Sequence, residues 1–321
     1  MRWQLARRGL LAGLMLMAAG AAARAEEVLR LDFAYYNPVS LVLKERHWVE
    51  DSVGPEVRVE WVQSAGSNKA LEFLRGRGLD FGSTAGSAAL LGRANGAPVK
   101  AIYVYGQMEW TALVTRADSP IHTVADLRGK RVAATPGTDP GIFLLRALDA
   151  AGLSRADITL VPLQHADGRL ALDRGDVDAW AGLDPFMALA EAQSHDRLFF
   201  RDRALVTPGT LLVREAYAAE HPERVAQVLA AYERGRAWAR ANPEALADIL
   251  ATAAKLPIEV AKLQLSRDDF SAAVLGPDQR ASITAAARVL KGSGSVSEGA
   301  DLDRAAAELI DTSFTDKLAA Q

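Results

Sequence analysis

The stretch Arg131-Val-Ala-Ala-Thr-Pro-Gly-Thr-Asp-Pro140 joins a short apolar run, a turn and a helix start within ten residues. Residues 131–134 predict a buried strand, and Asp139-Pro140 begins a helix that we expect to reach about Ala151. A strand that leads through a tight turn into a helix is the repeating unit of an α/β sheet. The sequence therefore predicts the α/β fold class.

The same unit recurs on both sides of this stretch. Apolar, β-branched runs predict further strands at residues 28–33, 57–62, 79–82, 99–104, 158–161 and 179–183. A helical pattern follows each of these strands except the one at 99–104. From Leu211 onward apolar residues recur at helical spacing, so we expect an almost entirely helical tail. Two α/β units followed by a helical return predict two lobes, with a hinge where the chain crosses between them twice.

The N-terminus has the three parts of a secretory signal peptide. Arg2, Arg7 and Arg8 precede the uncharged residues 9–23, and the small-x-small sequence Ala23-Arg24-Ala25 follows. This pattern predicts residues 1–25 as a signal peptide that is cleaved after Ala25. The pair Arg7-Arg8 leaves open whether export uses the Sec or the twin-arginine route.

Composition excludes several classes of partner. The chain has no cysteine, which removes a lipidated cysteine anchor, disulfides and thiolate metal sites. Loss of residues 1–25 removes four arginines and no acid, so the formal charge moves from −3 to −7. A mildly acidic protein lacks the basic surface that nucleic acids and anionic membranes require. Roughly 300 residues remain, enough for two modest domains.

Polar and aromatic residues follow the predicted strands. In open α/β sheets, ligands bind outside the carboxyl ends of the strands, where loops lead into helix N-termini. Small residues there let the backbone approach a ligand, and the free N–H groups suit an anion. The candidate ligand-binding residues are Tyr35, Tyr36, Asn37, Ser83, Thr84, Gly137, Thr138, Trp180 and Asp184.

Each candidate also has a purely structural interpretation. Tyr35 and Tyr36 could pack in a core, and Ser83 and Thr84 could form an ordinary turn that caps a helix. Trp180 is either a core residue or an aromatic wall of the site. The neighbouring acids suit helix starts: Asp139 is expected as an N-cap and Asp184 as a capping residue before Pro185.

Catalytic patterns are missing from the sequence. It contains no Gly-x-Ser-x-Gly elbow, no phosphate-binding P-loop and no Gly-x-Gly-x-x-Gly after the first strand. The five histidines are scattered, with no pair at metal-ligand spacing. We therefore predict a protein that is not an enzyme, with no catalytic residues, no metal and no cofactor.

Three segments carry a family resemblance. Thr123-Val-Ala-Asp-Leu-Arg-Gly-Lys-Arg-Val132 with Gly137-Thr138, Leu79-Asp-Phe-Gly-Ser-Thr84, and Gly175-Asp-Val-Asp-Ala-Trp-Ala181 with Asp184-Pro185 resemble the aliphatic-sulfonate, taurine and nitrate group of ABC-transporter solute-binding proteins. The likeness covers residues 28–250. It implies a type II periplasmic-binding-protein fold, with two α/β lobes joined by a two-strand hinge. Lobe 1 would then comprise residues 26–113 and 211–321, and lobe 2 residues 114–210.

The resemblance also implies a function. It predicts a monomeric periplasmic protein that binds a small organic anion, an aliphatic sulfonate, between the lobes and delivers it to an ABC permease in the inner membrane. It would place eight of the nine candidate residues, all except Asn37, near the ligand. Another solute remains open, such as nitrate, taurine or the thiamine-precursor pyrimidine; inward-pointing Asp139 and Asp184 would favour a heterocycle. An enzyme on the same fold would need those two carboxylates within hydrogen-bond reach, and a receptor-linked sensing module would look the same.

Overall fold

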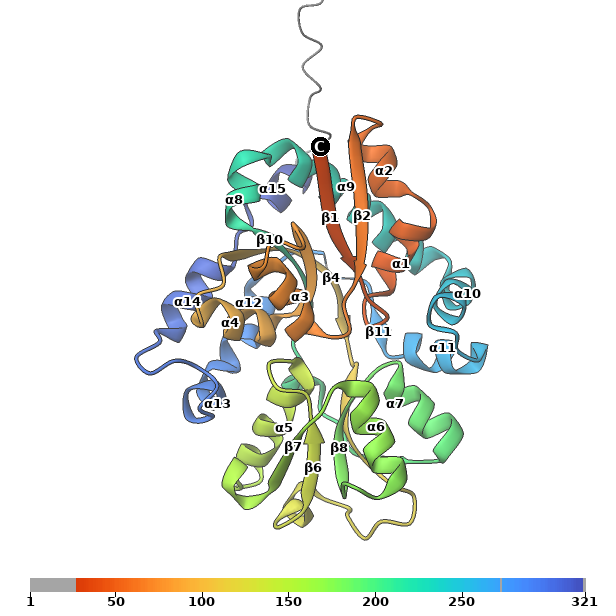
Figure 1. The fold of residues 1–321 in the computed structure, drawn as a ribbon, viewed down its shortest axis with the longest axis vertical. Helices are drawn as coiled ribbons and strands as arrows, with labels where there is room; N and C mark the ends of the chain where they lie inside the picture. The colour runs from red at the N-terminus through yellow and green to blue at the C-terminus, as the bar shows by residue number, and fades with distance from the viewer. Residues whose placement is uncertain (1–26, 272, 320–321) are drawn as a thin grey trace, which may run out of the picture.

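The computed structural model describes residues 27–271 and 273–319, so the predicted signal peptide lies outside the described residues. Two separate β-sheets, each covered by helices, form two lobes that follow one another along the long axis of the molecule (Figure 1). The prediction of a two-lobed α/β fold is confirmed.

The first part of lobe 1 alternates strands with helices. Asn37 starts the first helix as predicted, because its side chain accepts a hydrogen bond from Ser40 N and Pro38 occupies the first helical position. The elements are β1 (Glu27–Phe33), α1 (Pro38–Glu45), α2 (Trp48–Val53), β2 (Val57–Gln63), α3 (Ser67–Arg75), β3 (Phe81–Ala85), α4 (Gly86–Ala94) and β4 (Val99–Met108).

Lobe 2 repeats the alternation. The predicted capping box is present, since Thr123 and Asp126 exchange side-chain and backbone hydrogen bonds around a short 3-10 helix. The elements are β5 (Thr111–Thr115), η1 (Val124–Leu127), β6 (Arg131–Ala134), α5 (Asp139–Ala150), η2 (Arg155–Asp157), β7 (Thr159–Pro162), α6 (His165–Arg174), β8 (Ala179–Leu183), α7 (Phe186–Leu189), the π-helical turn η3 (Ala190–Ser194) and β9 (Arg197–Phe200).

The return to lobe 1 is mostly helical. It begins with a central strand of the sheet, however, so the prediction of helix from Leu211 onward is wrong for that segment. The elements are η4 (Arg203–Leu205), β10 (Gly209–Arg214), α8 (Glu215–Glu220), α9 (Pro222–Ala241), α10 (Pro243–Ala254), α11 (Ile258–Leu265), β11 (Asp268–Asp269), α12 (Pro277–Ala285), α13 (Ala287–Gly292), α14 (Leu302–Leu309) and α15 (Ser313–Ala319).

The sheets show how the lobes are wound. The lobe 1 sheet has the order β11-β4-β10-β3-β1-β2, and the lobe 2 sheet β7-β6-β8-β5-β9. β1 and β2 pair in parallel from Glu27 opposite Val57 to Phe33 opposite Gln63. β10 runs antiparallel between β3 and β4. Leu211–Val213, three of its five buried residues, form a short apolar run, and such a run does not by itself separate a strand from a helix.

The chain changes sheet at two places. Glu109 and Trp110 connect β4 to β5, and residues 201–208 connect β9 to β10. Both changes come a few residues before the expected lobe boundaries at 113 and 210. The Glu109 carboxylate accepts hydrogen bonds from Arg201 Nε at 2.8 Å and from Arg203 Nε at 2.9 Å. One side chain of the first crossing therefore binds the second crossing.

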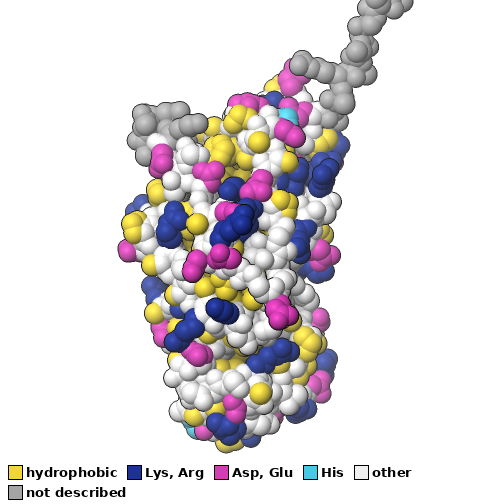
Figure 2. Space-filling model, turned by 90° about the vertical axis from the view of Figure 1, so that its left-hand side faces the viewer, with side chains coloured by type: hydrophobic (Ala, Val, Ile, Leu, Met, Phe, Trp, Pro, Cys, Tyr) yellow, Lys and Arg dark blue, Asp and Glu magenta, His cyan; other side chains and the backbone are white. Residues whose placement is uncertain are grey.

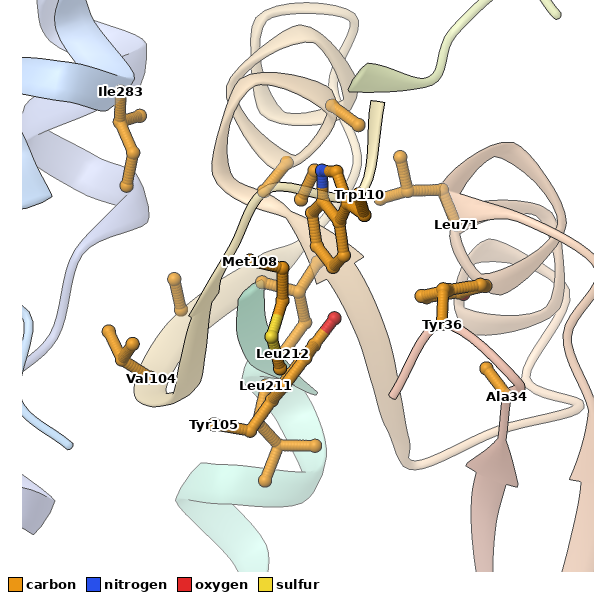
Figure 3. Close-up of a cluster of buried hydrophobic side chains, with 14 of the residues drawn as sticks. Ala34, Tyr36, Leu71, Val104, Tyr105, Met108, Trp110, Leu211, Leu212 and Ile283 are labelled. Carbon is orange, nitrogen blue, oxygen red and sulfur yellow. The ribbon is translucent and has the colours of Figure 1, made fainter. Parts of the chain in front are cut away.

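Most of the core is continuous through both lobes. One cluster of buried side chains includes Leu31 and Phe81 from lobe 1 and Leu113 and Phe143 from lobe 2. Near the crossings, the rings of Tyr36 and Trp110 pack edge to face with their centroids 6.0 Å apart (Figure 3). The ring centroid of Tyr105 lies 6.4 Å from that of Trp110. These contacts hold the first crossing against lobe 1.

The surface carries charges of both signs. Lys and Arg side chains are interspersed with Asp and Glu over the face shown in Figure 2. Among the described residues, no helix has the length and apolar character needed to cross a membrane.

Candidate functional site

A small cavity lies between the two lobes. Its volume is about 10 Å³, which is space for one water molecule. Lobe 1, lobe 2 and the first crossing all contribute to its wall. The lining residues are Tyr36, Ser67, Ala85, Trp110, Thr138, Asp139, Pro140, His165 and Leu183.

Four helices begin at this cavity. Ser67 is the first residue of α3, Ala85 is the N-cap of α4, Thr138 is the N-cap of α5, and His165 is the first residue of α6. Each N-terminus is the positive end of a helix dipole. At α4 the first two N–H groups, those of Gly86 and Ser87, already donate to Pro208 O and Thr207 Oγ1. The lining contains no Lys or Arg among the described residues, so helix termini supply the positive potential here.

The first candidate loop is held against β3. Tyr36 Oη donates to Ser83 O at 2.9 Å, and Asn37 Nδ2 donates to Ser83 Oγ at 2.7 Å. Ser83 in turn donates from N and Oγ to Asp32 Oδ1, at 2.8 and 2.9 Å. Tyr36 lines the cavity, whereas Asn37 and Ser83 form the buried layer behind it.

Thr84 and Tyr35 also lie away from the cavity. Thr84 is fully buried in β3, and its hydroxyl is 3.1 Å from that of Thr210 on β10. The next residue, Ala85, reaches the cavity instead. Tyr35 lines a separate hollow of lobe 1 beside α10, and its backbone carbonyl accepts a hydrogen bond from Gln264 Nε2 at 2.8 Å.

Thr138 holds the start of α5 at the cavity. Its Oγ1 donates to Thr135 O at 2.7 Å and accepts from Gly141 N at 3.5 Å, which makes Thr138 the N-cap. The expectation that Asp139 is the N-cap is therefore wrong; it is the first helical residue. Gly137 adopts φ +74 in the preceding turn and lines another hollow of about 220 Å³ between α5 and β7.

Asp139 joins both lobes and both crossings. Its carboxylate accepts hydrogen bonds from Ser87 Oγ at 2.5 Å, Thr207 Oγ1 at 2.6 Å and Trp110 Nε1 at 3.0 Å. Ser87 belongs to lobe 1, and Trp110 and Thr207 belong to the crossings. Burial raises the pKa of Asp139 above its usual range, and these donors act against that rise.

Trp180 and Asp184 have partners outside the cavity. Trp180 is fully buried in a separate core of lobe 2 that includes Leu172 and Met187. Asp184 Oδ1 accepts from Ala188 N at 2.8 Å, which agrees with the capping interpretation. Its Oδ2 lies 3.0 Å from Arg267 Nη1, so the carboxylate forms a buried ion pair with the lobe 1 return. Burial raises the pKa of Asp184 to about 6, although Arg267 lowers it.

The two carboxylates considered for an enzyme therefore bind different groups. Asp139 is held by two hydroxyls and an indole, and Asp184 by a backbone N–H and Arg267. No hydrogen bond joins the two in the described structure. Within the described ranges, no group of three or more His, Asp or Glu side chains is placed to hold a metal ion.

Sequence reasoning named no candidate in the segments that carry the lining residues Ser67, Trp110 and His165. Three other lining residues, Ala85, Pro140 and Leu183, lie next to candidate loops but were not candidates themselves. Ser67 ends the loop Ser64-Ala-Gly-Ser67, and His165 follows β7, so both come after strands that the sequence did predict. The rule that ligands bind at the carboxyl ends of strands applies to those loops as well. Trp110 gave no such signal, because it lies on the crossing between the sheets.

The comparisons with known proteins agree on one family. A model of the NMT1/THI5-like family matches residues 55–246. The chain is 33% identical over 254 residues to a protein of Escherichia coli strain K12 named for binding aliphatic sulfonates, and the match covers 78% of this chain and 79% of the relative.

Solved structures show the same fold. The alkanesulfonate-binding protein SsuA of Xanthomonas axonopodis pv. citri bound to MOPS has a TM-score of 0.81 at 24% identity, covering 89% of this chain and 98% of that one. The periplasmic aliphatic sulphonate-binding protein SsuA of Escherichia coli has a TM-score of 0.76 at 28% identity, covering 87% and 91%. These relatives are binding proteins.

Proposed function

The chain belongs to the NMT1/THI5-like family, and we propose that it binds an aliphatic sulfonate between its lobes and delivers it to the permease of an ABC importer. Its role as a solute-binding protein follows from its relatives. The sulfonate and the permease are our proposals.

One observation supports an anionic solute above all. The N-termini of α3, α4, α5 and α6 converge on a single cavity between the lobes. A sulfonate has three oxygens that share one negative charge and accept hydrogen bonds in several directions. The positive ends of four helix dipoles match that charge without a Lys or Arg counter-ion.

Binding requires the lobes to separate. The cavity of about 10 Å³ is far smaller than the roughly 300–1,000 Å³ of ordinary small-molecule sites. The two crossings, at residues 109–110 and 201–208, are the segments about which the lobes can rotate. We propose that the solute enters an open form and that closure then buries it against the four helix termini.

We place the mature protein in the periplasm, because its relatives include a periplasmic binding protein and its N-terminus has the pattern of a signal peptide. We also propose that it is a monomer. N-terminal sequencing of protein recovered from the periplasm is expected to begin at Glu26. A start at Met1 in the cytoplasm would contradict this location.

Isothermal titration calorimetry tests the solute. We expect linear alkanesulfonates to bind with micromolar dissociation constants, and nitrate, sulfate and a thiamine-precursor pyrimidine to bind much more weakly. If no sulfonate binds more tightly than millimolar, the proposed solute class is wrong.

A matched pair of variants places the ligand. Thr138→Val removes the hydroxyl that caps α5 at the cavity, and we expect the dissociation constant to rise about tenfold. Thr123→Val removes the capping hydroxyl of η1 on the exposed surface of lobe 2, and it should leave affinity unchanged. If Thr138→Val and Thr123→Val bind the sulfonate with the same affinity, the ligand does not bind at the start of α5.

A further inference from the structure

His165 is a buried, titratable side chain on the wall of the cavity. It is 1% exposed, it begins α6, and its ring lines the cavity. Burial lowers the pKa of His165 to about 3, so the imidazole is neutral at physiological pH. A neutral imidazole has one N–H donor and one bare acceptor nitrogen, and its neighbours decide which nitrogen is which.

Thr135 sets the tautomer of His165. The Thr135 hydroxyl donates its single hydrogen to Leu163 O at 2.8 Å. Its oxygen lies 3.1 Å from His165 Nδ1, and having given its proton away it acts there as an acceptor. Nδ1 therefore carries the proton and donates to Thr135, which leaves Nε2 as a bare acceptor.

This acceptor faces lobe 1 across the cleft and has no partner. His165 Nε2 is buried without a hydrogen bond, and so is Asn68 Oδ1, which belongs to α3. A Cβ built on Gly66 would lie 2.9 Å from each of these two atoms. Two unpartnered acceptors, one from each lobe, thus point to the same place beside the cavity.

A sulfonate group does not satisfy these acceptors. Its oxygens carry only lone pairs, so they repel His165 Nε2 and are better placed against the positive ends of α3, α4 and α5. Asp139 adds no donor, because its carboxylate oxygens already accept from Ser87, Thr207 and Trp110. The second end of the solute must supply the missing hydrogen.

Given the proposed function, we infer that the solute is a sulfonate whose carbon chain bears an O–H or N–H donor, and that His165 Nε2 accepts that hydrogen. A site built to bond a hydroxyl or an amine discriminates strongly against the analogue that lacks it, because its buried acceptor then stays unpaired.

Three two-carbon sulfonates test the inference by calorimetry on the full mature chain. Ethanesulfonate, 2-hydroxyethanesulfonate and 2-aminoethanesulfonate differ only in the terminal group. We expect at least one of the two donor-bearing compounds to bind tenfold or more tightly than ethanesulfonate. If ethanesulfonate binds as tightly as both, the inference fails and the proposed function stands. If none of the three binds, and longer alkanesulfonates also do not, both fail.

The variant Thr135→Val tests the inference more directly than the choice of ligand, because it changes which nitrogen of His165 carries the proton. It removes the acceptor for Nδ1–H, so the proton is free to move to Nε2 and turn that acceptor into a donor. We expect the preference for donor-bearing sulfonates to fall at least tenfold. Nitrogen NMR of the His165 ring reports the tautomer directly, with the proton on Nδ1 in the original chain.

The matched control is Thr115→Val. The Thr115 hydroxyl also donates to a backbone carbonyl, that of Asp178 at 3.0 Å, and it lies on β5 outside the cavity lining. This variant should keep the full preference for donor-bearing sulfonates. A ring that carries its proton on Nε2 in the original chain, or an unchanged preference in Thr135→Val, would overturn the inference.

Discussion

The substitution Asp32→Asn measures how much the buried, charged carboxylate of Asp32 lowers the free energy of unfolding. Asp32 is fully buried on β1, and its Oδ1 accepts hydrogen bonds from Ser83 N and Oγ. Burial raises the pKa of Asp32 from 3.8 to about 6, although the hydrogen bonds from Ser83 lower it. Asparagine keeps the Oδ1 acceptor and carries no charge.

The sign of the effect follows from proton binding. Between pH 4 and 6 the folded state holds the Asp32 proton more often than the unfolded chain, so the free energy of unfolding falls as the pH rises. Well above pH 6, Asp32 is ionised in both states, and the free energy of unfolding falls no further on its account. The difference between 3.8 and about 6 corresponds to on the order of 3 kcal/mol. We therefore expect Asp32→Asn to be more stable than the original protein at pH 8, by up to that amount.

Urea denaturation followed by circular dichroism at pH 4 and pH 8 checks this expectation. At pH 4 the original carboxyl is mostly protonated, so the two proteins should differ little. Asp118→Asn is the control, since that side chain is exposed and should change stability little at either pH. Equal stability of Asp32→Asn and the original protein at pH 8, or a destabilisation of the same size at both pH values, would refute the reasoning.

Two further substitutions test how the lobes meet. Arg267→Met leaves the buried Asp184 carboxylate without its cation, and we expect urea denaturation to show a loss of about 3–5 kcal/mol. Gly66→Ala places a Cβ 2.9 Å from His165 Nε2 across the cleft. We expect it to hold the lobes apart, with a larger radius of gyration in X-ray scattering and weaker solute binding.

Each of these variants has a matched control. Arg304→Met breaks the exposed pair with Glu308 and should change stability little, so an equal loss in both arginine variants would contradict the role of burial. Gly292→Ala puts its Cβ where nothing lies within 4 Å, and it should leave both scattering and affinity unchanged. A Gly66→Ala protein as compact as the Gly292→Ala protein would show that the cleft accommodates the methyl group.

Features that depend on near neighbours were predictable from the sequence. The cap at Asn37 and the capping box from Thr123 to Asp126 each involve residues three positions apart, so the local pattern determines them. The strand at residues 131–134 and the helix after it also form where predicted. The early part of the return was mistaken for helix, because β10 is identified only by its pairing with β3 and β4, which are distant in the sequence.

The makeup of the cleft depended on partners far along the chain. Asp184 was a candidate ligand contact, yet its cation, Arg267, is 83 residues away and comes from the other lobe. Trp180 could equally have been a wall or a core residue until the structure placed it in the interior of lobe 2. Ser67 and His165 reach the cavity because two loops from different sheets meet there.

The sequence by itself determined that strands alternate with helices and that polar loops lead into helix N-termini, because period, capping and turn chemistry act over a few residues. Only the tertiary structure decided which N-termini share one cavity, that Asp139 ties the lobes together, and that His165 Nε2 is buried without a hydrogen bond. Those properties depend on how two sheets face each other, and contacts between residues far apart in the chain produce no periodic pattern in the sequence.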